Sequence, residues 1–283
     1  MALASVVIFS LLATRVYVGY DSFWHVFIAR QRGADFWREV AANAHPPLFY
    51  LLLKAAMQAF GHSTLVYRAW SIFSIAAATI LVATITTRVT ATPRWGVLAG
   101  ITFGLSATAI EIALEVRAYA LFTACSLAAI AAYLEWLGAR PGRSCGWHRA
   151  LLAASLSAAI LSHYSAAFLL CAMLATPALL ALTHRRWRAR LRRELSRHGL
   201  SVAAMFGLPL SIAALAYLVH LRRAGSLTSE LGDPAPGCAK GFAIAWRCGT
   251  DRPVRRQVLL PEAGFGSALA ITCAGQQPEP ARR

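Results

Sequence analysis

Apolar stretches close to the roughly 20 residues that a helix needs to cross the hydrocarbon core of a bilayer recur along the first 221 positions. Charged residues make up only 14% of the chain, where a soluble domain carries about 25%. This pattern excludes an ordinary soluble domain and predicts an all-α fold, a polytopic bundle of about seven transmembrane helices. The expected spans are residues 2–20, 69–87, 95–110, 118–137, 150–162, 166–183 and 199–221.

The first span is expected to stay uncleaved, because no Lys or Arg precedes it and no clear cleavage site follows; a cleaved signal peptide is the alternative. Residues 21–66 mix charged and aromatic side chains, which indicates short amphipathic helices at the membrane interface within the first outer loop. The prolines after His45 break the chain, and Leu48 to Phe60 is expected to form a new helix. Lys54 within it favours an interfacial position over a full crossing.

The arginines predict the orientation of the bundle. Twelve of them fall in the loops 88–94, 138–149 and 184–198, and such loops stay in the cytoplasm. We therefore expect a plasma-membrane protein with a cytoplasmic N-terminus. Residues 21–66 and the turns at 115–119 and 163–164 then face outward together. The net charge of +16 reflects this topology, and no basic domain with interleaved aromatic residues predicts a nucleic-acid partner.

The segment 222–283 departs from this pattern, because it is rich in Pro, Gly and Cys and has no run long enough to cross a bilayer. We expect 1–221 to form the transmembrane domain and 222–283 an irregular or disordered tail. Out-of-frame translation of this segment is a second hypothesis. The six cysteines include no CxxC pair, so no zinc site or disulfide framework is predicted.

Several polar residues in the outward-facing regions are candidates for catalysis or ligand binding. Asp21 directly follows the first span and is either a helix-end carboxylate among the headgroups or a general base with a raised pKa. Glu111, Glu115 and Arg117 lie near bilayer depth, where each charge costs about 2.5 to 3.5 kcal/mol unless it has a partner or faces a cavity. They either neutralise one another structurally or form a functional site, and we favour function for Glu115 and Arg117.

Other candidates are weak one by one. His45 could simply mark the start of a helix, and the pair His163-Tyr164 could be interfacial. Arg68 and Lys54 could extend toward the headgroups or meet a phosphate.

The order and spacing of these pieces resemble the GT-C membrane glycosyltransferases, closest to the protein O-mannosyltransferase-like and aminoarabinose-transferase-like group (glycosyltransferase family 39-type). The matching pieces are Asp21, HPPLFYLLL at 45–53, Phe60-Gly61, Arg68, LEVRAYAL at 114–121 and LSHY at 161–164. The resemblance covers about residues 1–221. The family has a second acidic residue where this chain has Ser22, and its members continue for several more spans, which implies a shortened scaffold here.

The resemblance implies transfer of a monosaccharide from a polyprenyl-phosphate donor to a hydroxyl of a lipid, glycan or protein acceptor, by inverting displacement on the outer face. The implied catalytic residues are Asp21 and Glu115. The implied substrate-binding residues are His45, Arg68, Arg117, Tyr119, His163 and Tyr164. Some members of the superfamily use a divalent cation, but no complete ligand set, and so no cofactor, is assigned in this sequence.

Two other interpretations stay open. A transporter or lipid flippase would use Glu111, Glu115 and Arg117 to line a path through the membrane. An inactive glycosyltransferase fragment would also carry these motifs, and Ser22 favours it. No GxxxxGK[ST] loop or dinucleotide fingerprint is present, so ATP- or NAD-dependent chemistry is unsupported.

Overall fold

The computed structural model of the chain describes residues 2–16, 18, 20–43, 45–138 and 146–221, and two strands at 242–246 and 255–259. Side chains are described for these residues except 2, 20, 21, 221 and the strands. The chain divides into the units Met1–Ser226 and Leu227–Arg283.

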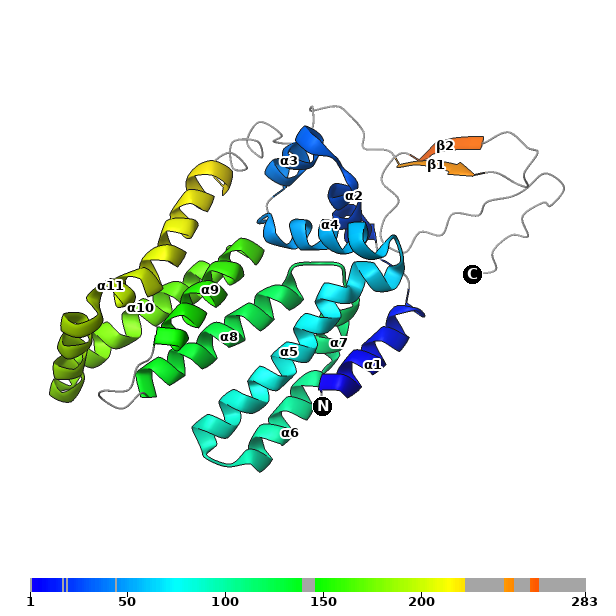
Figure 1. Ribbon diagram of the computed structural model, residues 1–283. Helices are drawn as coiled ribbons and strands as arrows, with labels where there is room; N and C mark the ends of the chain where they lie inside the picture. The colour runs from blue at the N-terminus through cyan, green and yellow to red at the C-terminus, as the bar shows by residue number, and fades with distance from the viewer. Residues whose placement is uncertain are drawn as a thin grey trace. The chain divides into compact units, whose positions relative to one another are not determined.

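The first unit is built from helices, which Figure 1 shows as a bundle with a group of shorter helices at one end. The described helices are α1 (Ala2–Ala13), α2 (Tyr20–Arg30), α3 (Gly33–Ala42), α4 (Leu48–Phe60), α5 (Thr64–Thr90), α6 (Pro93–Gly104), α7 (Ala107–Leu114), α8 (Tyr119–Gly138), α9 (Gly146–Ser162), α10 (Ala166–Thr183), α11 (Arg185–Ala216) and the π-helical η1 (Tyr217–Leu221).

The second unit contains two strands that the sequence interpretation did not anticipate. β1 (Phe242–Trp246) pairs antiparallel with β2 (Arg255–Leu259), with Ile244 opposite Gln257. Aromatic and β-branched residues in β1 favour extended structure. The rest of the expected tail at 222–283 lies outside the described residues.

Four of the described helices are long and apolar enough to cross a membrane, namely α5, α8, α10 and α11 with η1. The pair α6 and α7 is a fifth candidate, bent by 55°. Helices α1 and α4 are apolar but shorter. The unit is therefore helical with four or five candidate spans, and the expected number of seven stays a prediction.

The bend between α6 and α7 interrupts a segment expected to be one span at 95–110. Ser106 causes the interruption, because its Oγ accepts a hydrogen bond from the Ala109 N–H (3.2 Å) and donates one to the Phe103 carbonyl (2.7 Å). A serine that caps a new helix competes with the continuation of the old one. Helix α7 then ends at Leu114, and Glu115 is extended.

The segment 184–198 was expected to be a loop, and this expectation was wrong for nearly all of it. Residues 185–197 are helical and precede a kink at His198, where φ is −135° and ψ is 24°. Arginine and leucine are strong helix formers, which explains why a basic juxtamembrane segment does not stay irregular. Arg190 in this helix donates to the Trp136 carbonyl (3.0 Å) and so ties α11 to α8.

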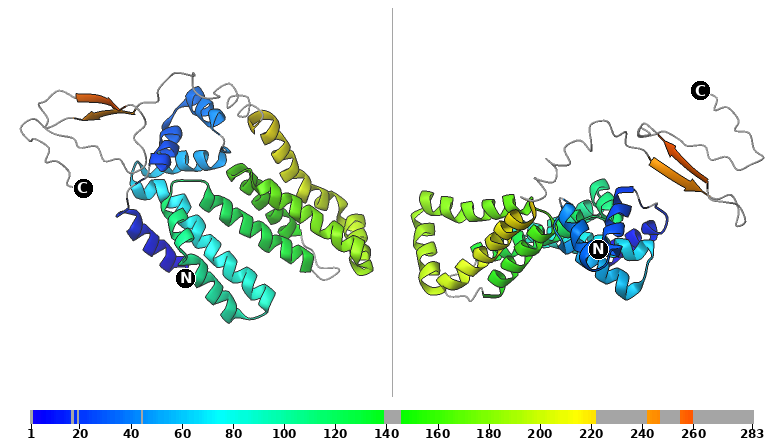
Figure 2. Two further views of the ribbon diagram at one scale, coloured as in Figure 1. Left: turned by 180° about the vertical axis from the view of Figure 1, so that it is seen from behind. Right: turned by 90° about the horizontal axis from the view of Figure 1, so that it is seen from above.

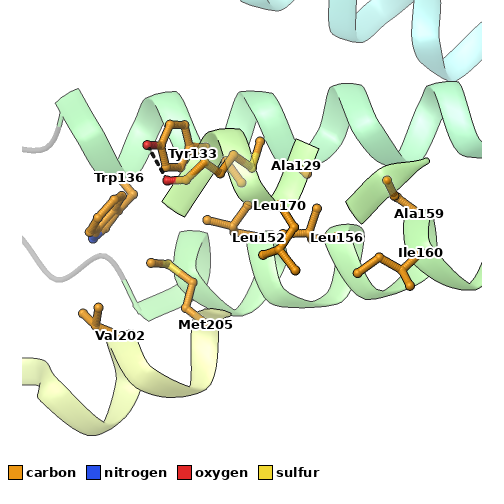
Figure 3. Close-up of a cluster of buried hydrophobic side chains, with 13 residues drawn as sticks. Ala129, Tyr133, Trp136, Leu152, Leu156, Ala159, Ile160, Leu170, Val202 and Met205 are labelled. Carbon is orange, nitrogen blue, oxygen red and sulfur yellow. Dashed lines mark hydrogen bonds between the residues drawn. The ribbon is translucent and has the colours of Figure 1, made fainter. Parts of the chain in front are cut away.

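Small residues allow the long helices to pack closely. The core formed by α8, α9, α10 and α11 combines alanines with Leu152, Leu156 and Met205, as Figure 3 shows. Within it, the Tyr133 hydroxyl donates to the Met173 carbonyl (2.9 Å), so that the buried phenol is satisfied. Between α5 and α6, a Cβ at Gly96 would collide with Thr87, and glycine is therefore required there.

The connections sort to the two ends of the bundle. In Figures 1 and 2, the α5–α6 and α10–α11 turns lie at one end, and α2, α3 and α4 lie at the other, beside the start of α8. Helices α2 and α4 pack there against the segment before α8, through Val26, Phe49, Leu53 and Val116. The arrangement brings the N-terminal region next to the α7–α8 connection.

Arg68 of α5 ties the ends of α1 and α7 to the bundle. Its side chain is 1% exposed, and its guanidinium donates to the carbonyls of Leu114 (2.5 Å), Ala13 (2.6 Å) and Val16 (2.9 Å). Carbonyls at the end of a helix have no partner within it, so these bonds replace the missing ones. Arg68 therefore fixes where α1 and α7 end.

Replacement of Arg68 by Met is expected to lower the free energy of unfolding by about 3 kcal/mol, because buried carbonyls lose their donor. Unfolding in mixed micelles, followed by far-ultraviolet circular dichroism, measures the change. Arg38→Met is the control, because Arg38 is exposed and pairs with Asp35 on α3. Equal stability of the two variants would contradict this role for Arg68.

Candidate functional site

The segment from Glu115 to Ala118 joins α7 to α8 and is held in place by hydroxyl groups of two other helices. Ser71 of α5 donates to the Glu115 carbonyl (2.7 Å). Ser22 of α2 is buried and accepts a hydrogen bond from the Val116 N–H (3.1 Å). These two bonds hold the peptide unit that joins Glu115 to a buried Val116, so the neighbouring side chains project from a defined position.

Glu115, Arg117 and Tyr119 form a group on this segment. Arg117 Nε lies 3.8 Å from Glu115 Oε2, and Nη1 donates to the Tyr119 hydroxyl (3.5 Å). The guanidinium also lies over the Tyr119 ring, 5.6 Å from its centroid. The Arg117 and Glu115 side chains are 23% and 35% exposed, so both can meet a ligand.

The carboxyl group of Glu115 is unusual for an acid beside an arginine. Burial, and then the neighbouring Glu111, raise its pKa above the ordinary value. A carboxyl whose ionised form is partly destabilised can hold a proton or accept one during a reaction. The group therefore combines a fixed cation, a tunable carboxyl and a phenol.

Three histidines from separate parts of the chain meet next to this group. The ring of His45, before α4, lies 5.4 Å from the ring of His25 and 6.1 Å from that of His163, between centroids. His163, between α9 and α10, lies 5.6 Å from the ring of Tyr119. The expected site residues His45, Tyr119 and His163 are thus brought together.

His25 was not among the residues expected from the sequence. It is 3% exposed, and its Nδ1 lies within hydrogen-bond distance of the Tyr50 hydroxyl (3.0 Å). Burial, and then His45, lower its pKa to about 4, while burial and His163 lower the pKa of His45. Both rings are therefore neutral near pH 7. The signal for His25 was its place one helical turn after Asp21 in α2.

Tyr164 belongs to a chain of two hydrogen bonds, through His220 to Val40, that the sequence did not reveal. His220 Nε2 lies 3.0 Å from the Val40 carbonyl, which can only accept, so this nitrogen carries a proton. In the neutral ring Nδ1 is then the acceptor, and the Tyr164 hydroxyl donates to it (2.5 Å). Burial raises the pKa of Tyr164 to about 12, which keeps this donor protonated.

Arg68 and Asp21 were also expected to be site residues. The Arg68 guanidinium is buried and donates to backbone carbonyls, and the substrate-binding role expected for it stays a prediction. Asp21 lies in the first turn of α2, but its side chain is outside the described residues. Its catalytic role stays a prediction.

Among the described side chains, no group of three His, Cys, Asp or Glu residues has a metal-binding arrangement. The ring of His45 lies between those of His25 and His163, with centroid distances of 5.4 and 6.1 Å. Comparison with protein-family models, curated proteins and solved structures found no match. A function is therefore inferred from the residues and their geometry.

The free energy of unfolding is expected to depend on pH through His25. Its pKa is about 4 when folded and about 6.5 when unfolded, so the unfolded chain binds the extra proton between these values. Stability should fall by up to about 3 kcal/mol as the pH drops from 6.5 to 4. His25→Gln should flatten this slope in a pH series of unfolding curves. An unchanged slope in the variant would contradict a buried, neutral ring.

Proposed function

We propose that this protein is a membrane glycosyltransferase that moves a monosaccharide from a polyprenyl-phosphate donor to an acceptor hydroxyl. The observation that carries the proposal is the convergence of Glu115, Arg117 and Tyr119 with His45 and His163 at one end of a helical membrane bundle. These are the motif positions at which the sequence resembles the GT-C enzymes.

Arg117 is the group suited to the leaving phosphate. Its guanidinium is held by Glu115 and Tyr119 but stays partly exposed, and arginine matches phosphate oxygens through paired N–H donors. His45 is neutral, so it would contribute a hydrogen bond and no charge. Negative charge that develops on the phosphate during bond cleavage would then be stabilised by a donor already in position.

In the proposed reaction, the acceptor oxygen attacks the anomeric carbon while the bond from that carbon to the phosphate oxygen breaks. Asp21 takes the proton of the acceptor hydroxyl, and the polyprenyl phosphate leaves with the bonding electron pair. Glu115 orients Arg117 or the sugar. The configuration inverts, because a single displacement takes place.

The bundle suits an amphiphilic donor. The segments at 88–94 and 184–198 contain clustered arginines and lie at the end opposite to α2, α3 and α4 (Figure 1), which supports an outward-facing site. An apolar pocket of about 300 Å³ lies on α1, α4 and α5, with Phe60 and Phe73 in its walls. A pocket of this kind could hold part of a polyprenyl tail.

Asp21→Asn is expected to reduce sugar transfer at least 100-fold, the order of magnitude that a general base contributes. Membranes that contain the variant are supplied with radiolabelled polyprenyl-phosphate sugars, and product formation is measured. Asp35→Asn is the control, since Asp35 is an exposed carboxylate on α3 that pairs with Arg38. Normal turnover of the Asp21→Asn variant would show that another group takes the proton.

Arg117→Gln is expected to lower turnover by about 100-fold, because the leaving phosphate loses its charged donor. Arg38→Gln, which removes an exposed arginine from α3, should leave turnover unchanged. Single-turnover assays at saturating donor separate this effect from donor binding. A change confined to donor affinity would contradict a role for Arg117 in stabilising the leaving group.

A transporter of lipid-linked sugars is the second candidate, and the bend of 55° between α6 and α7 favours it. Broken helices near the middle of a span are common at transporter substrate sites, and Glu111 lies on the second half. Dithionite quenching of a fluorescent polyprenyl phosphate in reconstituted vesicles measures transbilayer movement. Movement without sugar transfer would replace the transferase proposal by this one.

A further inference from the structure

A second pocket, of about 530 Å³, lies where α2 ends, α3 begins and α4 passes. It is distinct from the Arg117 group, but it lies on the helices that carry His25 and its partner Tyr50, α2 and α4. Ala29 follows His25 by one turn of α2, and Lys54 follows Tyr50 by one turn of α4. The lining residues are Ala29, Arg30, Arg32, Gly33, Lys54, Met57, Gln58 and His62.

The lining of this pocket is positively charged. Arg30, Arg32 and Lys54 contribute to it, and no carboxylate does. Asp35, the acidic residue of the first turn of α3, pairs with Arg38 instead. Among the described residues, neither Arg30 nor Arg32 forms an ion pair. Two arginines beside a lysine, with no carboxylate in the lining, form an electrostatic environment suited to an anion.

The Lys54 side chain forms part of the pocket wall, where backbone carbonyls hold its ammonium group. Its ammonium group donates to the carbonyls of Gln31 and Ala29 (3.2 Å for the latter) and lies 4.7 Å from the centre of the Phe36 ring. These contacts hold the end of α2 against α4. Burial, and then the charge of Arg32, lower the pKa of Lys54.

The start of α3 adds to the positive potential. Its N-cap residue, Arg32, makes no side-chain cap, and Gly33 adopts a φ of 53° where the chain enters the helix. The N-terminal N–H groups of a helix carry partial positive charge. Gly33 places this helix end in the wall of the pocket, beside the two arginines.

We propose that this pocket is a binding site for a phosphate group, held by Arg30 and Arg32 and positioned by Lys54. Arginine pairs favour phosphate because two parallel N–H donors match two of its oxygens. The apolar Ala29 and Met57 and the amide of Gln58 leave room for an ester substituent on the phosphate. The phosphate belongs either to a free anion or to a lipid headgroup, and the site does not depend on the transferase proposal.

The test measures binding to the full chain in nanodiscs, with no transfer assay, so that its result is separate from that of the proposed function. Radiolabelled inorganic phosphate is titrated into discs of pure phosphatidylcholine. In a second arm, discs containing dioleoyl phosphatidic acid are used, and co-purified phosphatidic acid is quantified by mass spectrometry. The variants are Arg30→Gln with Arg32→Gln, and the control Arg38→Gln.

We expect the double substitution to weaken binding at least about 10-fold, since each arginine supplies charge-assisted hydrogen bonds, and Arg38→Gln to leave it unchanged. Dependence on the two arginines in the first arm identifies a free phosphate ligand, and dependence in the second alone identifies a lipid headgroup. Because both arginines are exposed, the double variant should fold, and circular dichroism checks this. Absence of binding in both arms, or equal binding by the double variant and wild type, would overturn the proposal.

Discussion

The hydrogen bonds of Arg68 are the interaction on which the position of the candidate site depends. A buried guanidinium in α5 serves the carbonyls of Ala13, Val16 and Leu114, so that one side chain completes the ends of α1 and α7. In a bilayer, where water cannot replace them, each unmade backbone hydrogen bond would be costly. Because Leu114 is fixed in this way, Glu115 begins its non-helical segment at a defined place, and this sets the position of the Arg117 group.

At this end of the bundle, neutral histidines provide packing and hydrogen bonds, and an arginine provides the charge. Burial lowers the pKa of His25, His45 and His163, so their rings contribute packing and hydrogen bonds near pH 7. Charge is supplied instead by Arg117, whose position is set by Glu115 and Tyr119. In the proposed reaction, an anionic donor would meet the positive charge of Arg117 beside uncharged rings, which favours a defined geometry of attack.

The predictable parts of this structure are those that local sequence governs. The prolines before Leu48 and the apolar run after it predicted α4 over the same residues. The motif residues Glu115, Arg117 and Tyr119 lie in contact, and their function stays a prediction. His220 was not predictable, because its partner Val40 is 180 positions away and only the tertiary fold joins them. The bend at Ser106 was not predicted, because a single serine within an apolar run gives no sign in the sequence that its hydroxyl caps a new helix.

Ser22 links the architecture of the site to its chemistry. The resemblance places an acidic residue here, and the Ser22 hydroxyl accepts the Val116 N–H, a bond that a carboxylate could also accept. A carboxylate would bring a negative charge to the peptide unit that joins Glu115 to Val116, and burial and Glu111 already raise the pKa of Glu115. Serine keeps this hydrogen bond to the α7–α8 segment without adding a negative charge. The hydrogen bond and the negative charge at this position are therefore separable.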